Sequence, residues 1–118
     1  MAQHYRDLIA WQKAMDLVAH VYQITKSFPD EEKFGLVSQM RRCAVSVPSN
    51  IAEGQSRNSK GEFIQFLGIA RGSIAELTTQ ILISERLDYL NDPKTSLAMA
   101  EEVGRILSGL INSLTTNN

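Results

Sequence analysis

Residues 39–54 read Gln-Met-Arg-Arg-Cys-Ala-Val-Ser-Val-Pro-Ser-Asn-Ile-Ala-Glu-Gly, and this stretch decides the fold. Successive residues of an α-helix turn by about 100° around its axis. On such a wheel one side of the stretch and its preceding turn is apolar: Leu36, Met40, Cys43, Ala44, Val47 and Ile51. The opposite side is polar: Gln39, Arg42, Ser46, Ser49, Asn50, Glu53 and Arg57. We therefore predict an amphipathic helix that buries its apolar side in a helical core.

Pro48 stands in the middle of this predicted helix. A proline there removes one amide hydrogen and crowds the carbonyl four residues back, at Ala44. Such a residue costs about 3 kcal/mol in a helix interior. The same helical phase continues on both sides of Pro48, so we predict a kink rather than a break.

Turn and capping signals divide the rest of the chain into helices. Phe28-Pro29 ends the first helix, because proline disfavours the helical conformation in the residue before it. Ser59 and Glu62 form a capping box, and Asp92-Pro93 is a favourable helix start. In the first helix, an apolar stripe is predicted to face the core: Leu8, Trp11, Met15, Val18, Val21 or Tyr22, and Ile24 or Thr25. The predicted helices cover residues 8–27, 31–55, 60–90 and 93–115.

No stretch of the chain alternates apolar and polar residues as a half-buried β-strand does. Helices joined by short turns favour antiparallel neighbours. The 118 residues are therefore predicted to form a single all-α domain, an up-down-up-down antiparallel four-helix bundle.

Composition restricts the classes of function and the compartment. The net charge is −1, which gives no strong field to attract nucleic acid or acidic lipid. Cys43 is the single cysteine, so no internal disulfide forms and a reducing compartment fits. The first residues lack the basic-then-apolar order of a signal peptide, and no apolar run approaches the roughly 20 residues that span a bilayer. We predict a cytoplasmic protein that does not enter the membrane.

The residues that usually carry catalysis are scattered. No cysteine, histidine or carboxylate pair has metal-ligand spacing, and no glycine-rich phosphate loop is present. Cys43 lies on the apolar side of its helix, where an inert thiol is expected. Ser46 and Ser49 have no histidine in their motif to act as a base. The sequence predicts no catalytic residue, no metal and no cofactor.

The polar side of the second helix has three interpretations, because side chains three and four residues apart can touch along one face. The first is a subunit interface or interhelical network, in which Arg42 pairs with Glu53 of a neighbour. Small residues on the same face would allow close packing: Gly35, Ser38, Ser46 and Ser49. The small-residue middle of the third helix is a further candidate for subunit contacts: Ala70, Gly72, Ser73 and Ala75. The second is nucleic-acid binding through a basic set: Arg41, Arg42, Arg57 and Lys60. The third is an enzyme or small-molecule site centred on Arg42, Asn50 and Glu53. The interface or ligand residues are Gln39, Arg41, Arg42, Ser46, Ser49, Asn50 and Glu53.

Four motifs across residues 5–90 resemble one known family, and the segment from Pro48 to Gly54 is the most specific of them. The motifs are Tyr5-Arg6-Asp7-Leu8-x-x-Trp11-Gln12-Lys13-Ala14, Ser27-Phe28-Pro29, Ser38-Gln39-x-Arg41-Arg42-x-x-x-Ser46-x-Pro48-Ser49-Asn50-Ile51-Ala52-Glu53-Gly54 and Glu62-Phe63-x-x-Phe66-Leu67. They are similar to the four-helix-bundle family of 23S rRNA intervening-sequence proteins. The fourth helix matches that family only in pattern.

The resemblance implies a bacterial, cytoplasmic bundle without established enzymatic activity that assembles into a ring, typically a pentamer. A related branch comprises the accessory proteins of diversity-generating retroelements, which are basic and bind a reverse transcriptase and nucleic acid. This chain departs from that branch in its net charge of −1. Broad phosphate binding would require its basic residues to cluster on one assembled face.

Overall fold

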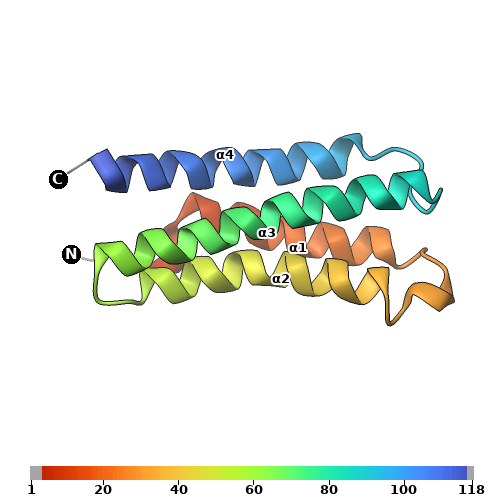
Figure 1. Ribbon diagram of the computed structural model, residues 1–118, viewed down its shortest axis with the longest axis horizontal. Coiled ribbons are helices and arrows are strands. Elements are labelled where there is room, and N and C mark those ends of the chain that lie inside the picture. Colours follow the sequence, from red (N-terminus) through yellow and green to blue (C-terminus); the bar gives the residue numbers. More distant parts are fainter. Residues whose placement is uncertain (1–3, 117–118) are drawn as a thin grey trace.

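The computed structural model describes residues 4–116 and consists of four long helices that lie side by side (Figure 1). The α-helices are α1 (Ile9–Thr25), α2 (Leu36–Gln55), α3 (Lys60–Arg86) and α4 (Lys94–Thr116). Two short 3-10 helices precede α1 and α2: η1 (Tyr5–Asp7) and η2 (Asp30–Glu32). No strand occurs among these residues. The predicted antiparallel four-helix bundle is confirmed.

The helices occupy the corners of a square in chain order. α2 packs against α1 and α3, and α4 packs against α3 and α1. α1 and α3 therefore lie diagonally opposite each other, as do α2 and α4. The predicted apolar side of α2 lies in the core, where Met40, Ala44, Val47 and Ile51 have no exposed surface.

The core face of α1 differs from the predicted one. Its buried residues are Ala10, Ala14, Leu17, Val21 and Thr25, of which Val21 and Thr25 agree with the predicted stripe. Of the predicted stripe, Trp11 and Val18 are half-buried and Met15 is 44% exposed. Two alanines on the core side leave room for neighbouring helices to approach α1 closely. The bulkier apolar side chains instead face outward along α2.

The acidic run at residues 30–32 does not begin α2 as predicted. It forms η2, and α2 starts later, at Leu36. The N-cap of α2, Gly35, has a non-helical backbone with φ −109° and ψ −110°. Glu32 Oε1 accepts a hydrogen bond from the following amide, that of Leu36, at 3.2 Å. Tyr89 donates its hydroxyl to the other carboxylate oxygen of Glu32 at 2.8 Å. This carboxylate thus fixes the start of α2 and joins the two turns at that end of the bundle.

α3 begins as predicted, with Ser59 Oγ accepting the Glu62 amide at 3.2 Å. It ends at Arg86, earlier than residue 90. Asp88 adopts a left-handed conformation with φ 63°. The Tyr89 amide donates to the Ser84 carbonyl at 2.9 Å, and the Asp88 amide donates to the Glu85 carbonyl at 3.0 Å. This pair of bonds is the Schellman motif, which stops a helix.

Pro48 lies inside α2, and the helix continues through it without a break, as predicted. The kink at Pro48 stays a prediction. Its ring is buried on the side toward α1. Two turns beyond, Gly54 brings α2 close to α3: a Cβ at this glycine would lie 2.6 Å from Phe66 Cβ. The segment from Pro48 to Gly54 therefore faces α1 at one end and packs closely on α3 at the other.

Candidate functional site

A polar hollow of about 480 Å³ opens on the surface between α2 and α3. We call it the polar hollow, and its lining residues are Phe34, Ser38, Gln39, Arg42, Cys43, Ser46 and Glu76. Three residues of the predicted polar side of α2 meet here: Gln39, Arg42 and Ser46. Glu76 comes from α3, and sequence reasoning did not identify it.

The polar groups at the floor of the polar hollow already form hydrogen bonds within the chain. Ser46 Oγ lies 2.6 Å from the Cys43 carbonyl oxygen and 2.7 Å from Ser73 Oγ. A hydroxyl has one proton, so Ser46 donates to the carbonyl and accepts from Ser73. Cys43 Sγ donates to the Ser73 carbonyl at 3.1 Å, and Asn50 Nδ2 donates to the Ser46 carbonyl at 2.7 Å. The bonds to Ser73 join α2 to α3. Because these groups already have partners, the floor offers few free polar atoms to an external ligand.

The rim of the polar hollow carries two opposite charges that do not pair. Arg42 and Glu76 are both exposed, and neither joins an ion pair within residues 4–116. Glu76 accepts one long hydrogen bond, from Gln80 Nε2 at 3.5 Å. Gln80 is itself buried, and its Oε1 has no hydrogen-bond partner. A buried acceptor without a partner is uncommon, and it lies one helical turn from Glu76.

The Cys43 thiol is unsuited to nucleophilic chemistry. Burial, reinforced by the negative charge of Glu76, raises the pKa of Cys43 to about 11. The thiol is therefore protonated at neutral pH, in which state it is a poor nucleophile. Within residues 4–116, no group of three or more His, Cys, Asp or Glu residues could hold a metal ion.

Arg41 turns away from the polar hollow and ties α2 to α1. Its Nε donates to Thr25 Oγ1 at 2.9 Å, and a terminal nitrogen donates to the Tyr22 carbonyl at 3.3 Å. The guanidinium also lies 4.5 Å from the centre of the Tyr22 ring. The structure thus separates Arg41 from Arg42, its neighbour in the predicted set.

The remaining basic residues of the predicted nucleic-acid set are engaged within the chain. Arg57 pairs with Glu53 at 2.9 Å and with Glu62 at 3.7 Å. Its guanidinium lies 4.9 Å from the centre of the Phe66 ring. Lys60 also has a partner. Glu53, expected to meet Arg42 of a neighbour, thus has a partner four residues away on its own helix.

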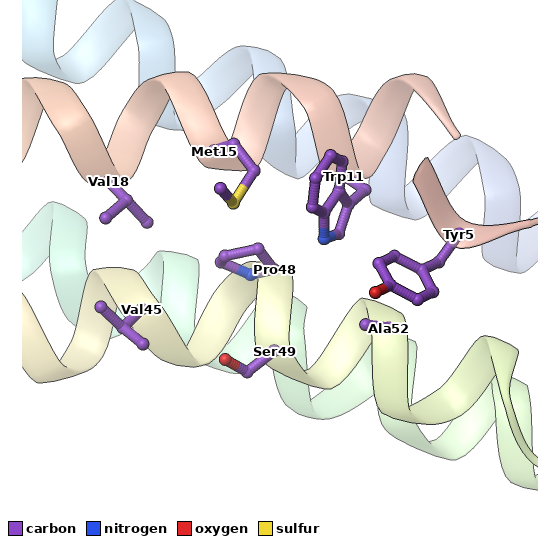
Figure 2. A pocket seen from close by; sticks show the side chains of 8 residues that line it. All are labelled: Tyr5, Trp11, Met15, Val18, Val45, Pro48, Ser49 and Ala52. Carbon is purple, nitrogen blue, oxygen red and sulfur yellow. The ribbon is translucent and has the colours of Figure 1, made fainter. Parts of the chain in front are cut away.

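An apolar groove of about 320 Å³ lies on the other side of α2, between α2 and α1 (Figure 2). We call it the apolar groove, and its lining residues are Tyr5, Trp11, Met15, Val18, Val45, Pro48, Ser49 and Ala52. None of them is charged. Ser49, predicted to share the polar side, lies here instead. The signal for the groove was the stripe of large side chains on α1, which sequence reasoning assigned to the core.

These features define an all-helical bundle protein with a polar hollow and an apolar groove on the two flanks of α2. The chain belongs to the family of 23S rRNA-intervening sequence proteins, whose family model matches residues 6–109. No helix among the described residues combines the length and the hydrophobicity needed to cross a membrane.

One solved structure has the same fold over most of both chains. It is a protein with unknown function from the S23 ribosomal protein family of Bacteroides thetaiotaomicron. The TM-score is 0.81 at 21% sequence identity, and the match covers 88% of this chain and 96% of that chain. A search of curated protein sequences returned no significant match.

Proposed function

We propose that this chain is the subunit of a non-enzymatic homo-oligomer, a helical-bundle module that serves as a cytoplasmic scaffold or binding platform. The observation that carries this proposal is the pair of unpaired charges, Arg42 and Glu76, on the rim of the polar hollow. A surface with an unpaired cation and an unpaired anion is complementary to another copy of itself. Opposite charges arranged in this way favour one specific register of association.

The chemistry of the polar hollow favours assembly over catalysis. Its thiol is protonated, because the pKa of Cys43 is raised to about 11. Its Ser46 hydroxyl is already bonded to the Cys43 carbonyl of α2 and to Ser73 of α3. No histidine lines the hollow to act as a general base. The polar side chains of the lining that are left for a partner are Ser38, Gln39 and the two rim charges.

The geometry also favours assembly over nucleic-acid binding. Phosphate contacts need free cationic side chains along one surface. Arg41 is bonded to α1, and Arg57 is paired with two carboxylates. Arg42 alone is then left on this surface, with Glu76 opposite it.

Light scattering of the purified protein at micromolar concentrations tests the proposal. We expect a mass of several subunits, and the resemblance to the family implies a pentameric ring. Arg42→Glu and Glu76→Arg should each lower the mass, whereas the double variant should restore it. Arg105→Glu on α4 is the matched control and should leave the mass unchanged. A wild-type protein that is monomeric under these conditions would refute the proposal.

A further inference from the structure

The outward side of α3 carries a stripe that is poor in charge for a solvent-exposed helix face. The stripe follows steps of three and four residues, and all its members are exposed: Ile69, Gly72, Glu76, Thr79 and Ile83. Ile69 is 48% exposed and Ile83 is 43% exposed. Surface helices normally present charged and polar residues to water. This face holds one charge, which is that of Glu76.

Glycines within this face have no explanation inside the subunit. A Cβ at Gly68 or Gly72 would meet no atom within 4 Å. Glycine destabilises a helix relative to alanine, and close helix packing is the usual reason to keep it there. Close packing at Gly54 is visible in the bundle, but at Gly72 no neighbour is present. A helix from outside the subunit would supply one.

The apolar groove between α1 and α2 is the matching surface. Its lining has no charged residue, and Met15 and Val45 are 44% and 39% exposed. An uncharged groove between two helices suits the apolar face of a third helix. α3 of the same chain cannot fill it, because α3 is diagonally opposite α1 in the bundle.

The two surfaces stand at the same height along the bundle. Ser46 on α2 contacts Ser73 on α3, and Gly54 on α2 contacts Phe66 on α3. The α2 residues of the groove, Val45 to Ala52, therefore lie level with the part of α3 that contains Ile69 and Gly72. Arg42 and Glu76 are also level, since both line the polar hollow.

We propose, building on the homo-oligomer proposed above, that the apolar groove of one subunit receives the α3 stripe of the next subunit, head to tail. The bundles stand parallel to the ring axis in this arrangement. Rotation about that axis moves no residue along it, so residues at the same height along the bundle meet. Ile69 and Gly72 then enter the neighbouring groove while Glu76 meets the neighbour's Arg42. α2 and α3 occupy adjacent corners of the bundle (Figure 1), so the two surfaces are rotated relative to each other about the long axis of the bundle. Head-to-tail contacts with that rotation close into a small ring.

A glycine substitution tests the contact without disturbing the subunit. Gly72→Gln places a side chain on the α3 stripe, where the subunit has open space. Gly109→Gln on α4 is the matched control, because Gly109 is also exposed and also has no atom within 4 Å of its Cβ position. We expect light scattering to give a monomer for Gly72→Gln and the wild-type mass for Gly109→Gln. Circular dichroism should give wild-type helicity for both variants.

A mixing experiment tests which two surfaces meet. Val45→Glu blocks the apolar groove and leaves the stripe intact, whereas Gly72→Gln blocks the stripe and leaves the groove intact. Each variant alone should be monomeric, and an equimolar mixture should give a dimer, because one intact joint remains possible. A mixture that stays monomeric would overturn the head-to-tail pairing.

The outcomes separate this inference from the proposed function. If the wild type assembles and Gly72→Gln assembles equally well, the pairing of groove and stripe is wrong while the homo-oligomer stands. If the wild type is monomeric, the homo-oligomer and the pairing are both wrong.

Discussion

Gly54 gives the sharpest prediction about the packing of α2 against α3. A Cβ at this position would lie 2.6 Å from Phe66 Cβ, 3.2 Å from Phe63 Cδ1 and 3.3 Å from the Phe63 carbonyl oxygen. Carbon atoms in contact prefer separations of about 3.5–4.0 Å. Phe66 Cβ is attached directly to the backbone, so rotation of the side chain cannot relieve the overlap. Gly54→Ala must therefore shift α3 by about 1 Å.

The expected cost of this shift is that of overpacking a core, about 1–3 kcal/mol. Alanine also gains up to about 1 kcal/mol of helix propensity over glycine. Gly109→Ala on α4 receives that gain without a clash, because its Cβ position is open. We expect Gly54→Ala to be about 1–3 kcal/mol less stable than Gly109→Ala once the propensity gain is taken as common to both. For a chain of this length, that difference lowers the thermal midpoint by about 4 °C per kcal/mol.

The assay is thermal and urea unfolding followed by circular dichroism. Every variant must be measured at the same protein concentration, since association makes apparent stability depend on concentration. If Gly54→Ala proved as stable as Gly109→Ala, the close approach of α2 and α3 at this residue would be refuted.

Three predictions concern titratable groups. Cys43, with a pKa of about 11, should react with iodoacetamide at pH 8 about tenfold or more slowly than a free thiol. Burial lowers the pKa of His20, whose Nε2 lies 2.7 Å from Ser96 Oγ. As the pH is lowered, the imidazole therefore binds a proton in the unfolded chain before it does so in the folded one. The free energy of unfolding should decrease as the pH is lowered below about 6.5, and His20→Gln should remove part of that decrease. The pKa of Tyr89 is raised by its hydrogen bond to Glu32, so Glu32→Gln should lower it in an ultraviolet titration.

The residues around α2 illustrate how far sequence reasoning reached. The apolar side of α2 was predicted correctly because its residues recur in strict helical phase and are uninterrupted by charge. Its polar side was treated as one surface, yet the structure divides it between two flanks. Arg41 faces α1, Arg42 faces the polar hollow and Ser49 faces the apolar groove. A helical wheel gives angles around one helix, but it does not place the neighbouring helices.

The helix ends show a second limit of prediction from the sequence. Ser59 was recognised as a cap because its partner, Glu62, lies three residues along the chain. The start of α2 depends on Glu32, which is held in place by Tyr89 from a distant turn. The end of α3 depends on Asp88 in a left-handed conformation, which is unusual for a residue other than glycine. Both of these depend on contacts or on backbone geometry that no local pattern specifies.

The sequence by itself determined that this chain is a four-helix bundle of its family, with α2 amphipathic and continuous through Pro48. These properties follow from local periodicity, capping and motif spacing, which act over a few residues. The tertiary structure alone decided that Ala10 and Ala14, rather than Trp11 and Met15, face the core. It also decided that Glu76 stands across from Arg42. The physical reason is that α1 has two adjacent apolar faces, and the packing of its neighbours selects which of them is buried.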